Sequence, residues 1–354
     1  MARVRFSCFR PLRLSLVVLT GLAGCPSMRM TVPVVNRKAT KERALRCLRA
    51  AVRYEHNPVV RLEAVEAFES SGCAEGLPWI RAALLDDHPA VRFAACVAVG
   101  RLADTMARQS VRLCLDQSDA SVRIGALFAL HRLGYREGTG RLATYLLHHE
   151  HATVRRNAAL VLGLLGERSG IKILARAMRD RDEGVRHHAL EAMARLGNPE
   201  AKRELIYMTR SGVGSEEVFA INALALTGDP TYRDTFRYTL ATAAHLETRL
   251  SSARALGRLG SDDGFTVALR ALQTKRVLVK DANDPPPEQI LRAVQMAAAA
   301  LGAIGRIDAI RPLLERMDDP ADPRVQVSAA RAVLEILKAD RRRGLPFSTS
   351  DAPS

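Results

Sequence analysis

The stretch DDHPAVRFAACVAVGRL, residues 86–102, decides the fold because its pattern returns along the chain. Read once, its aspartates, histidine and arginine resemble a catalytic cluster. With Val91 as the reference position, however, all but one of the intervals between equivalent positions lie within two residues of 31. The equivalent positions are Val60, Val91, Val122, Val154, Val185, Val218, Thr248, Ala293 and Val325. A fixed period of this length predicts a solenoid of helix pairs.

Each repeat follows the same local rules for beginning and ending a helix. Three residues before the reference position stands a good N-cap, whose side chain can accept a backbone N–H. These residues are Asn57, Asp119, Asp182, Ser215 and Asp322, with His88 and His151 in the same slot. Twelve residues after the reference position comes a glycine suited to a left-handed C-cap. These glycines are Gly72, Gly134, Gly166, Gly197, Gly260 and Gly305.

The segments DHPAVRFAACVAVGRL, SDASVRIGALFALHRLG and DEGVRHHALEAMARLG resemble HEAT repeats, specifically the short HEAT-like repeats of the phycobilisome-lyase type. The resemblance covers roughly residues 40–338. It implies an all-α fold, an α–α superhelix of about nine helix pairs. It also implies that the first helix of each pair lies on the convex side and the second lines the concave side.

The first 25 residues differ in composition from the rest of the chain. Four arginines precede the short apolar run LSLVVLTGLAG, and together they predict a secretory signal peptide over residues 1–24. Leu22-Ala23-Gly24-Cys25 resembles the lipobox of bacterial lipoproteins, which implies cleavage before Cys25 and a lipid on its sulfur. An ordinary signal peptide, or a short anchor that happens to contain cysteine, is the alternative.

The remaining boundaries follow from loss of the repeat pattern. Residues 25–38 are predicted to be the lipidated cysteine and a tether, and residues 39–338 the solenoid. The one long interval places an insertion loop at about 275–288, where the Asn-Asp-Pro-Pro-Pro run is expected to be non-helical. Residues 339–354 are predicted to be a disordered tail.

The charge of the chain narrows the choice of partner. The net charge is +15, or +11 once the four arginines of the signal segment are removed. Basic chains often bind nucleic acid, but an exported chain is not expected to meet it. Anionic lipid, envelope polymer or acidic protein are the competing partners.

Four cysteines remain after the signal segment, namely Cys47, Cys73, Cys96 and Cys114. None forms a CxxC pair, which argues against a zinc or thioredoxin-type site. Cys96 and Cys114 lie on consecutive predicted helices and could pair in an oxidising compartment. The preferred interpretation is that they are buried small apolar residues.

Two clusters invite a chemical interpretation. The recurrent aspartate and arginine are interpreted as a ladder of ion pairs between repeats, because an active site needs a constellation that occurs once. The histidines are weak metal candidates, because neighbouring residues on a helix point about 100° apart. They are His148, His149, His151, His187 and His188. No metal or other cofactor is predicted.

The concave surface is the predicted working face. Ten residues past the reference position stand Arg101, Arg132, Arg195 and Arg258, and Arg254 lies one turn earlier in its helix. Stacking would align them into a positive stripe beside Phe128, suited to carboxylate or phosphate groups on a partner. The alternative is that arginine only solubilises an alanine-rich array.

The sequence therefore predicts a non-enzymatic, lipid-anchored scaffold of the bacterial cell envelope that binds a protein or peptide, with no nucleic acid expected. The residue after Cys25 is Pro26 rather than aspartate, which favours the periplasmic side of the outer membrane over the inner membrane. A HEAT-like enzyme or nucleic-acid-binding protein, similar to a bilin lyase or a DNA glycosylase, is the alternative if the chain is not exported.

Overall fold

A computed structural model describes residues 36–136, 138–275 and 284–343 of the chain. The chain separates into two units, Met1–Asn36 and Arg37–Ser354. Asn36 is the one described residue of the first unit, and all the described helices belong to the second. Its regular structure consists of eighteen α-helices and six short 3₁₀ turns within the described residues, which confirms the predicted all-α solenoid.

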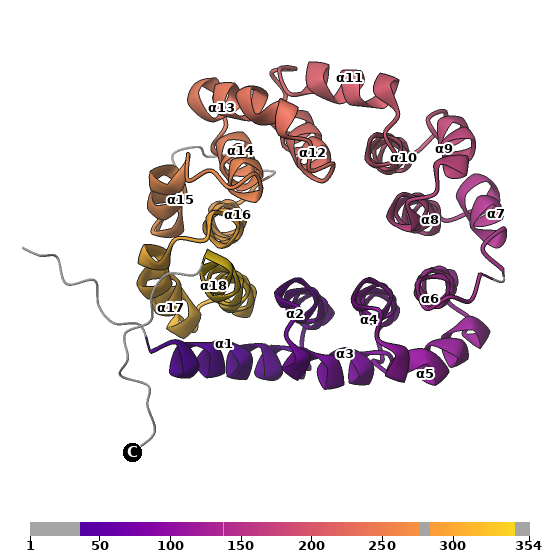
Figure 1. Cartoon of the computed structure of the whole chain (residues 1–354), viewed down its shortest axis with the longest axis horizontal. Coiled ribbons are helices and arrows are strands. Elements are labelled where there is room, and N and C mark those ends of the chain that lie inside the picture. Colours follow the sequence, from indigo (N-terminus) through magenta and orange to yellow (C-terminus); the bar gives the residue numbers. More distant parts are fainter. Residues whose placement is uncertain (1–35, 137, 276–283, 344–354) are drawn as a thin grey trace, which may run out of the picture. The chain divides into compact units, whose positions relative to one another are not determined.

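The helices of this unit form two concentric layers that alternate along the chain (Figure 1). The inner helices are α2 (Pro58–Ser71), α4 (Pro89–Leu102), α6 (Ala120–Arg132), α8 (Ala152–Leu165), α10 (Glu183–Arg195), α12 (Gly214–Ala225), α14 (Leu246–Arg258), α16 (Pro286–Ile304) and α18 (Pro323–Arg343). The outer helices are α1 (Arg37–Ala51), α3 (Leu77–Ala83), α5 (Arg108–Leu113), α7 (Arg141–His148), α9 (Ile171–Ala177), α11 (Pro199–Met208), α13 (Arg233–Thr242), α15 (Phe265–Leu272) and α17 (Ile310–Asp318).

The assignment of helices to the two faces corrects the sequence prediction. The helices that contain the reference positions were expected on the convex side, and they form the inner layer instead (Figure 1). A repeat of two helices can be counted from either one, so the resemblance predicts two layers without fixing which helix comes first. The arginines predicted to face a partner lie on these inner helices.

Most of the predicted helix starts are confirmed by their caps. Asn57 accepts a hydrogen bond from the Val59 N–H at 2.9 Å, and Asp119 and Asp182 accept from the third residue of their helices. His88 also caps, with its Nδ1 accepting from the Ala90 N–H at 3.2 Å. Ser215 was predicted wrongly, because α12 already begins at Gly214.

The predicted glycine C-caps all have positive φ angles, between 61° and 95°. In the same slot of α4 stands Ala103, with φ 52°, where a Cβ crowds the backbone. Its N–H still donates to the Gly100 carbonyl at 3.3 Å, so the helix ends in the same way as its neighbours. Ala103 is thus the one position with positive φ among the described non-glycine residues.

Glycines nine residues past the reference positions let neighbouring inner helices approach closely. A Cβ at Gly257 would lie 2.6 Å from the backbone nitrogen of Ile304 on α16. Gly100 and Gly163 leave similar space, where a Cβ would lie 2.9 Å from the Cα atoms of Ala129 and Ala192. Alanines on one inner helix, such as Ala129 and Ala192, are therefore matched by glycines on the preceding inner helix.

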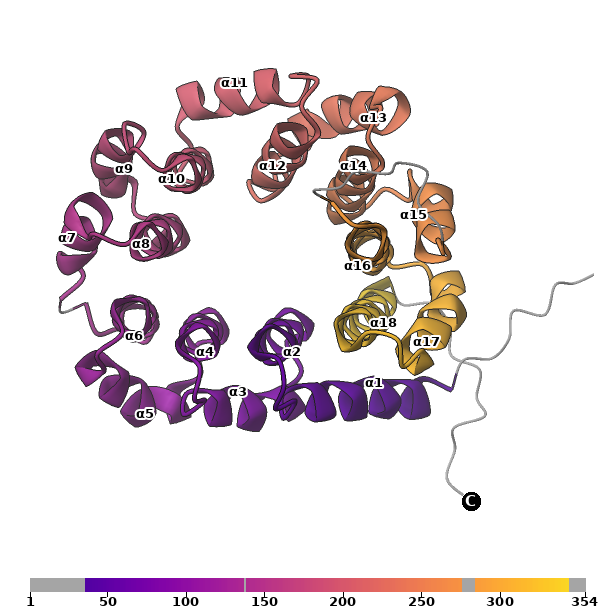
Figure 2. The same cartoon turned by 180° about the vertical axis from the view of Figure 1, so that it is seen from behind.

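The last inner helix packs against the first, so the solenoid unit closes on itself. In both views α18 lies beside α2 (Figures 1 and 2). The Lys338 ammonium group donates to the Ser70 carbonyl at 3.2 Å, and the Gln295 amide donates to the Glu63 carboxylate at 3.1 Å. The sequence predicted a superhelix but not its closure.

The outer side of the same seam is held by ion pairs between α1 and the end of the chain. Arg37 pairs with Asp340, whose side chain is 3% exposed, and Arg43 pairs with Asp318. The Cys47 thiol donates to the Gln326 carbonyl at 3.6 Å. These contacts tie residues nearly 300 positions apart in the sequence.

The helix bounds shift the predicted boundaries at both ends. α1 begins at Arg37, inside the predicted tether of 25–38, and α18 runs to Arg343, inside the predicted tail of 339–354. The packing of α18 against α1 and α2 explains this extension. The signal segment, Cys25 and residues 344–354 lie outside the described residues.

The proline-rich end of the insertion loop is part of a helix. α16 begins at Pro286, so Pro286 and Pro287 occupy its first turn, where a missing N–H costs nothing. The expectation that the whole proline run is non-helical was therefore wrong. Residues 276–283 of the predicted loop lie outside the described residues.

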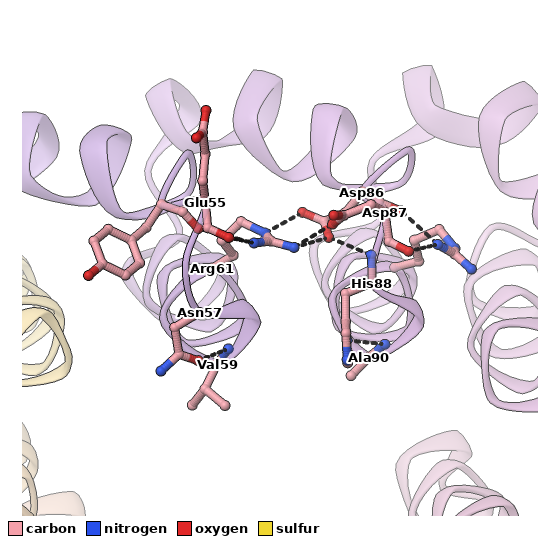
Figure 3. Close-up of polar contacts among 10 residues, drawn as sticks. Glu55, Asn57, Val59, Arg61, Asp86, Asp87, His88 and Ala90 are labelled. Atoms are coloured by element: carbon pink, nitrogen blue, oxygen red, sulfur yellow. Dashed lines mark hydrogen bonds and ion pairs between the residues drawn. The ribbon is translucent and has the colours of Figure 1, made fainter.

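The recurrent arginines bind the turn that precedes their own helix. Arg61 is 7% exposed, and it donates to the Asp86 carboxylate with two bonds of 2.8 Å and to the Tyr54 carbonyl at 3.0 Å. It also pairs with Asp87, and Figure 3 shows Arg61 held between Glu55 on one side and these aspartates on the other. Arg155 repeats the arrangement with Asp180, at 2.7 and 2.8 Å.

The predicted ion-pair ladder is confirmed at these two rungs and differs at the others. Arg92, Arg123 and Arg186 donate instead to carbonyl groups five and six residues earlier, at 2.6–3.3 Å. The residues that follow them by 25 positions are not acidic. The shared role of the arginine is to satisfy the last carbonyls of the preceding turn.

The four cysteines of the described residues are free thiols, and Cys96 and Cys114 are buried, as the preferred interpretation expects. Their sulfur atoms form a hydrogen bond, which raises the pKa of Cys96 and lowers that of Cys114. Cys114 in turn donates to the Ser110 carbonyl at 3.4 Å.

Replacing Ala103 by glycine should raise the free energy of unfolding by about 1 kcal/mol, because glycine adopts positive φ without the Cβ clash. Gly197→Ala, which introduces that clash at φ 89°, should lower it by a similar amount. Chemical denaturation measures both. A destabilised Ala103→Gly variant would contradict the account of this C-cap.

Asp180→Asn should lower the free energy of unfolding by about 2 kcal/mol at neutral pH, because it leaves the Arg155 side chain, which is 5% exposed, without its counter-charge. Hydrogen bonds from Arg155 lower the pKa of Asp180, so its stabilisation is present above about pH 4 and is lost as the pH falls further. Denaturation curves from pH 7 to pH 2 should show parent and variant converging.

The matched control for this variant is Glu200→Gln, because the Glu200 pair with Arg203 is 3.4 Å long and both side chains are about two-thirds exposed. An exposed pair contributes at most about 1 kcal/mol. Equal losses in the two variants, or a difference between parent and Asp180→Asn that persists at pH 2, would contradict the structural role of the ladder.

Candidate functional site: the arginine-lined cavity

The inner helices surround a cavity of about 980 Å³. Its lining comes from α2, α4, α8, α10, α14 and α18, together with residues at the start of α6 and the end of α12. Because these helices belong to the whole circuit of the solenoid, the cavity is the concave face of the unit, where Arg101 and Arg258 remain exposed. A second cavity of about 330 Å³ adjoins it and shares Glu66, Arg254 and Arg331 with it.

Four of the six residues predicted to contact a partner line this cavity: Arg101, Arg195, Arg254 and Arg258. The closed circuit brings them toward one another as a cluster rather than spreading them along an open stripe. Arg258 on α14 lies close enough to Arg101 on α4 and Arg195 on α10 for the like charges to lower its pKa. Helices far apart in the sequence therefore contribute to one site.

The other two predicted residues do not join the cluster. Phe128 is 1% exposed, and its ring fills the space beside Gly100. A Cβ atom added to Gly100 would lie 2.7 Å from this ring. Its prediction as a partner contact is wrong, because the close approach of α4 and α6 buries the ring. Arg132 is exposed but is not among the residues that line the cavity.

Three arginines of the cavity are held by glutamates. Arg101 pairs with Glu69 at 3.1 Å, Arg195 with Glu191 at 2.9 Å, and Arg331 with Glu335 at 3.0 Å. The last two pairs join successive turns of one helix, at positions i and i+4. The pairs fix the side chains while leaving guanidinium donors free to bind a ligand.

Arg254 and Arg258 differ from these three. Neither makes a hydrogen bond or an ion pair with any residue that the structure describes. Burial lowers the pKa of Arg254 to about 10, and the neighbouring charges of Arg258 and Arg331 add to the effect. Burial and like charges also lower the pKa of Arg258. The charge of Glu335 acts on both arginines in the opposite direction, and that of Glu66 acts on Arg254, but neither arginine has a direct ion pair among the described residues.

The acidic side chains of α2 form no ion pair with Arg254 or Arg258, although the charge of Glu66 acts on Arg254. Burial raises the pKa of Glu66 and of Glu69, against the opposing influence of Arg101 and Arg331. Glu69 is already paired with Arg101, and Glu66 forms no ion pair with another described residue. An anion that enters the cavity would therefore meet two guanidinium groups with donors to spare.

The helices α4 and α8 also contribute an apolar patch to the cavity, beside Arg101 and Asn157. This patch is formed by half-buried side chains of α4 and α8, namely Phe93, Val97, Leu160 and Leu164. The cavity therefore combines a charged half and an apolar half, as sites for organic anions do.

The histidines do not assemble into a metal site. His187 stacks on Phe219 with 4.4 Å between ring centroids, and the His188 Nδ1 atom lies 2.8 Å from the Gly184 carbonyl oxygen. The His149 ring lies 5.6 Å from the His151 ring, and His151 pairs with Glu150. Within residues 36–136, 138–275 and 284–343, no three histidine, cysteine or acidic side chains are grouped as metal ligands.

The sequence pattern that selected Arg101 could also have found residues that were missed. Glu335 stands ten residues past its reference position, as Arg101 does, while Glu66, Glu191 and Arg331 stand six past theirs, as Arg254 does. All four line the cavity. The predicted stripe contained arginines and Phe128 only, and it left out Glu191 and Glu335, which hold Arg195 and Arg331.

The fold and the family comparison agree on the class of protein. A model of HEAT repeats matches residues 36–131 and 141–216. The described residues thus form an α-solenoid, and the matched part of it resembles HEAT repeats, as the sequence pattern implied. No curated protein sequence matches it. No helix of the described residues has the length and apolar character needed to cross a membrane.

Solved structures show distant likeness in fold alone. Human deoxyhypusine hydroxylase, in complex with glycerol, is 17% identical over 85% of this chain and 98% of its own, with a TM-score of 0.37. The complex of CpcE and CpcF of phycocyanin lyase from Nostoc sp. PCC7120 is 19% identical over 66% of this chain and 94% of that chain, with a TM-score of 0.40. Kap121p bound to Pho4p is 14% identical over 80% of this chain and 36% of its own, with a TM-score of 0.34.

If Arg254 is kept for binding, removing its charge should stabilise the unliganded protein. Arg254→Met preserves the length of the side chain and should raise the free energy of unfolding by about 1 kcal/mol. Arg155→Met, which removes a structural arginine, should lower it. Sulfate should reduce the difference in free energy of unfolding between the parent and Arg254→Met, because sulfate binds and stabilises only the protein that keeps the charged site. Loss of stability in Arg254→Met would contradict the assignment.

Proposed function

We propose that this protein is a non-enzymatic scaffold that binds a protein or peptide segment in the cavity enclosed by its inner helices. The observation that carries the proposal is the pair Arg254 and Arg258, whose charges lie inside the cavity without an ion-pair partner among the described residues. Arg254 is half-buried and Arg258 is exposed to the cavity, so guanidinium donors without a direct ion pair are accessible to an anionic group of a partner.

The chemistry of the charged half supports binding rather than catalysis. A guanidinium group stays protonated near neutral pH, so it is suited to holding an anion and not to exchanging protons. The cavity glutamates serve to fix three of the arginines. Two of the solved structures with a similar fold are themselves complexes between proteins, CpcE with CpcF and Kap121p with Pho4p.

We also propose that the scaffold is attached to a membrane of the bacterial envelope through a lipid on Cys25, on the periplasmic side of the outer membrane. The lipobox resemblance of residues 22–25 and Pro26 support this placement. Mass spectrometry of the protein purified from membranes tests the anchor. An acylated N-terminal Cys25 supports it, and a product that retains Met1 contradicts it.

Affinity capture from detergent-solubilised envelopes tests the binding role. The parent should recover a protein partner. The triple variant that carries Arg101→Glu, Arg195→Glu and Arg258→Glu should recover at least about tenfold less of it, because three attractive charges become repulsive. This loss corresponds to a change in binding free energy of more than about 1.4 kcal/mol. Quantitative mass spectrometry of the bound fraction provides the measurement.

The matched control carries the same change of charge on the outside of the cavity, at Arg132, Arg203 and Arg311, each replaced by glutamate. Arg132 is exposed, and the side chains of Arg203 and Arg311 are 67% and 83% exposed. Recovery should match the parent. Equal recovery from the cavity variant and the control would refute binding through the cavity.

A further inference from the structure

The two halves of the cavity specify what kind of segment fits it. On the charged side, Arg254 and Arg258 lie one turn apart on the same face of α14 and line the same cavity. Both lack a hydrogen bond or ion pair with the described residues. Two adjacent guanidinium groups present donors for two carboxylate groups, or for both oxygens of one.

On the facing side, α4 and α8 contribute an apolar patch beside the polar side chains of Arg101 and Asn157. Phe93 and Val97 on α4 and Leu160 on α8 line the cavity and are half-buried, so their remaining apolar surface faces its interior. Covering this surface is favourable by about 25 cal/mol for each Å² removed from water. A simple inorganic anion would leave it uncovered.

The size and setting of the cavity exclude a folded domain. Its volume of about 980 Å³ lies at the upper end of the range for single organic ligands and corresponds to a short stretch of chain. The contacts of α2 with α18 and α16 close the circuit around it, so a partner reaches the arginines by inserting a segment. An extended peptide satisfies this constraint and can place side chains on both walls.

We infer that the cavity binds an extended acidic peptide segment in which leucine-like side chains alternate with carboxylates, the carboxylates on Arg254 and Arg258 and the apolar side chains on Phe93, Val97 and Leu160. The inference rests on the proposed binding role and deepens it, since it names the chemical class of the partner. Alternation suits the site because successive side chains of an extended strand point to opposite sides.

Fluorescence anisotropy with labelled octapeptides tests the inference on the full chain. The probe alternates leucine and glutamate, and two control peptides replace every glutamate by glutamine or every leucine by serine. The probe should bind at least about tenfold more tightly than either control. Its affinity should fall as salt rises, since screening weakens the charge contacts.

Variants assign the two walls separately. Arg254→Gln with Arg258→Gln should weaken binding of the probe at least tenfold. Val97→Ser with Leu160→Ser should weaken binding of the probe and leave the affinity for the serine control peptide unchanged. Arg132→Gln, outside the cavity, should bind like the parent. Circular dichroism melting confirms that each variant is folded, and any unfolded variant is replaced by Arg258→Gln or Val97→Thr alone.

Several outcomes would overturn the inference. Equal affinity for the probe and the glutamine peptide would remove the carboxylate requirement, and equal affinity for the serine peptide would remove the apolar one. Competition by sulfate or by a phosphorylated lipid headgroup as strong as by the probe would show a simple anion site. If envelope capture depends on the cavity while the peptides fail these tests, the proposed function stands and this inference falls. If the peptides pass while capture ignores the cavity, the proposed function fails.

Discussion

The packing of α18 against α2 is the constraint on which the rest of the structure depends. An open solenoid would display its arginines along a curved stripe, each exposed to water and far from most of the others. Closure puts α14 opposite α4 and α10, so that Arg258 experiences the charges of Arg101 and Arg195. The same contact encloses the cavity and limits a partner to an inserted segment. The functional proposal therefore depends on a contact between the ends of the array.

The sequence predicts the fold well because the fold is repetitive. Caps such as Asn57 and Asp182, the C-cap glycines and the recurrent arginine after the reference position are local signals, each read within a few residues. Four of the six residues predicted from the same repeat pattern to contact a partner line the cavity. Local periodicity is enough to identify which face of a helix is repeated from one unit to the next.

Two features could not be predicted because they accumulate over many repeats. Closure depends on a small rotation per repeat, which is set by close contacts such as Gly257 against the α16 backbone. Phe128 has the same register as Arg254, yet Gly100 on the neighbouring helix lets its ring become buried. Register indicates a face, while the residue on the adjacent helix decides whether that position reaches the cavity.

The most direct test of this account is a distance across the seam. Spin labels can be attached to cysteines introduced by Arg43→Cys and Asp318→Cys, after the other accessible cysteines are replaced by serine. These two substitutions remove an exposed ion pair, whose loss lowers the free energy of unfolding by at most about 1 kcal/mol. Dipolar electron resonance should then give one short, narrow distance between the labels. A broad distribution extending to the end-to-end length of an open solenoid would contradict closure, and with it the assembly of the arginine cluster.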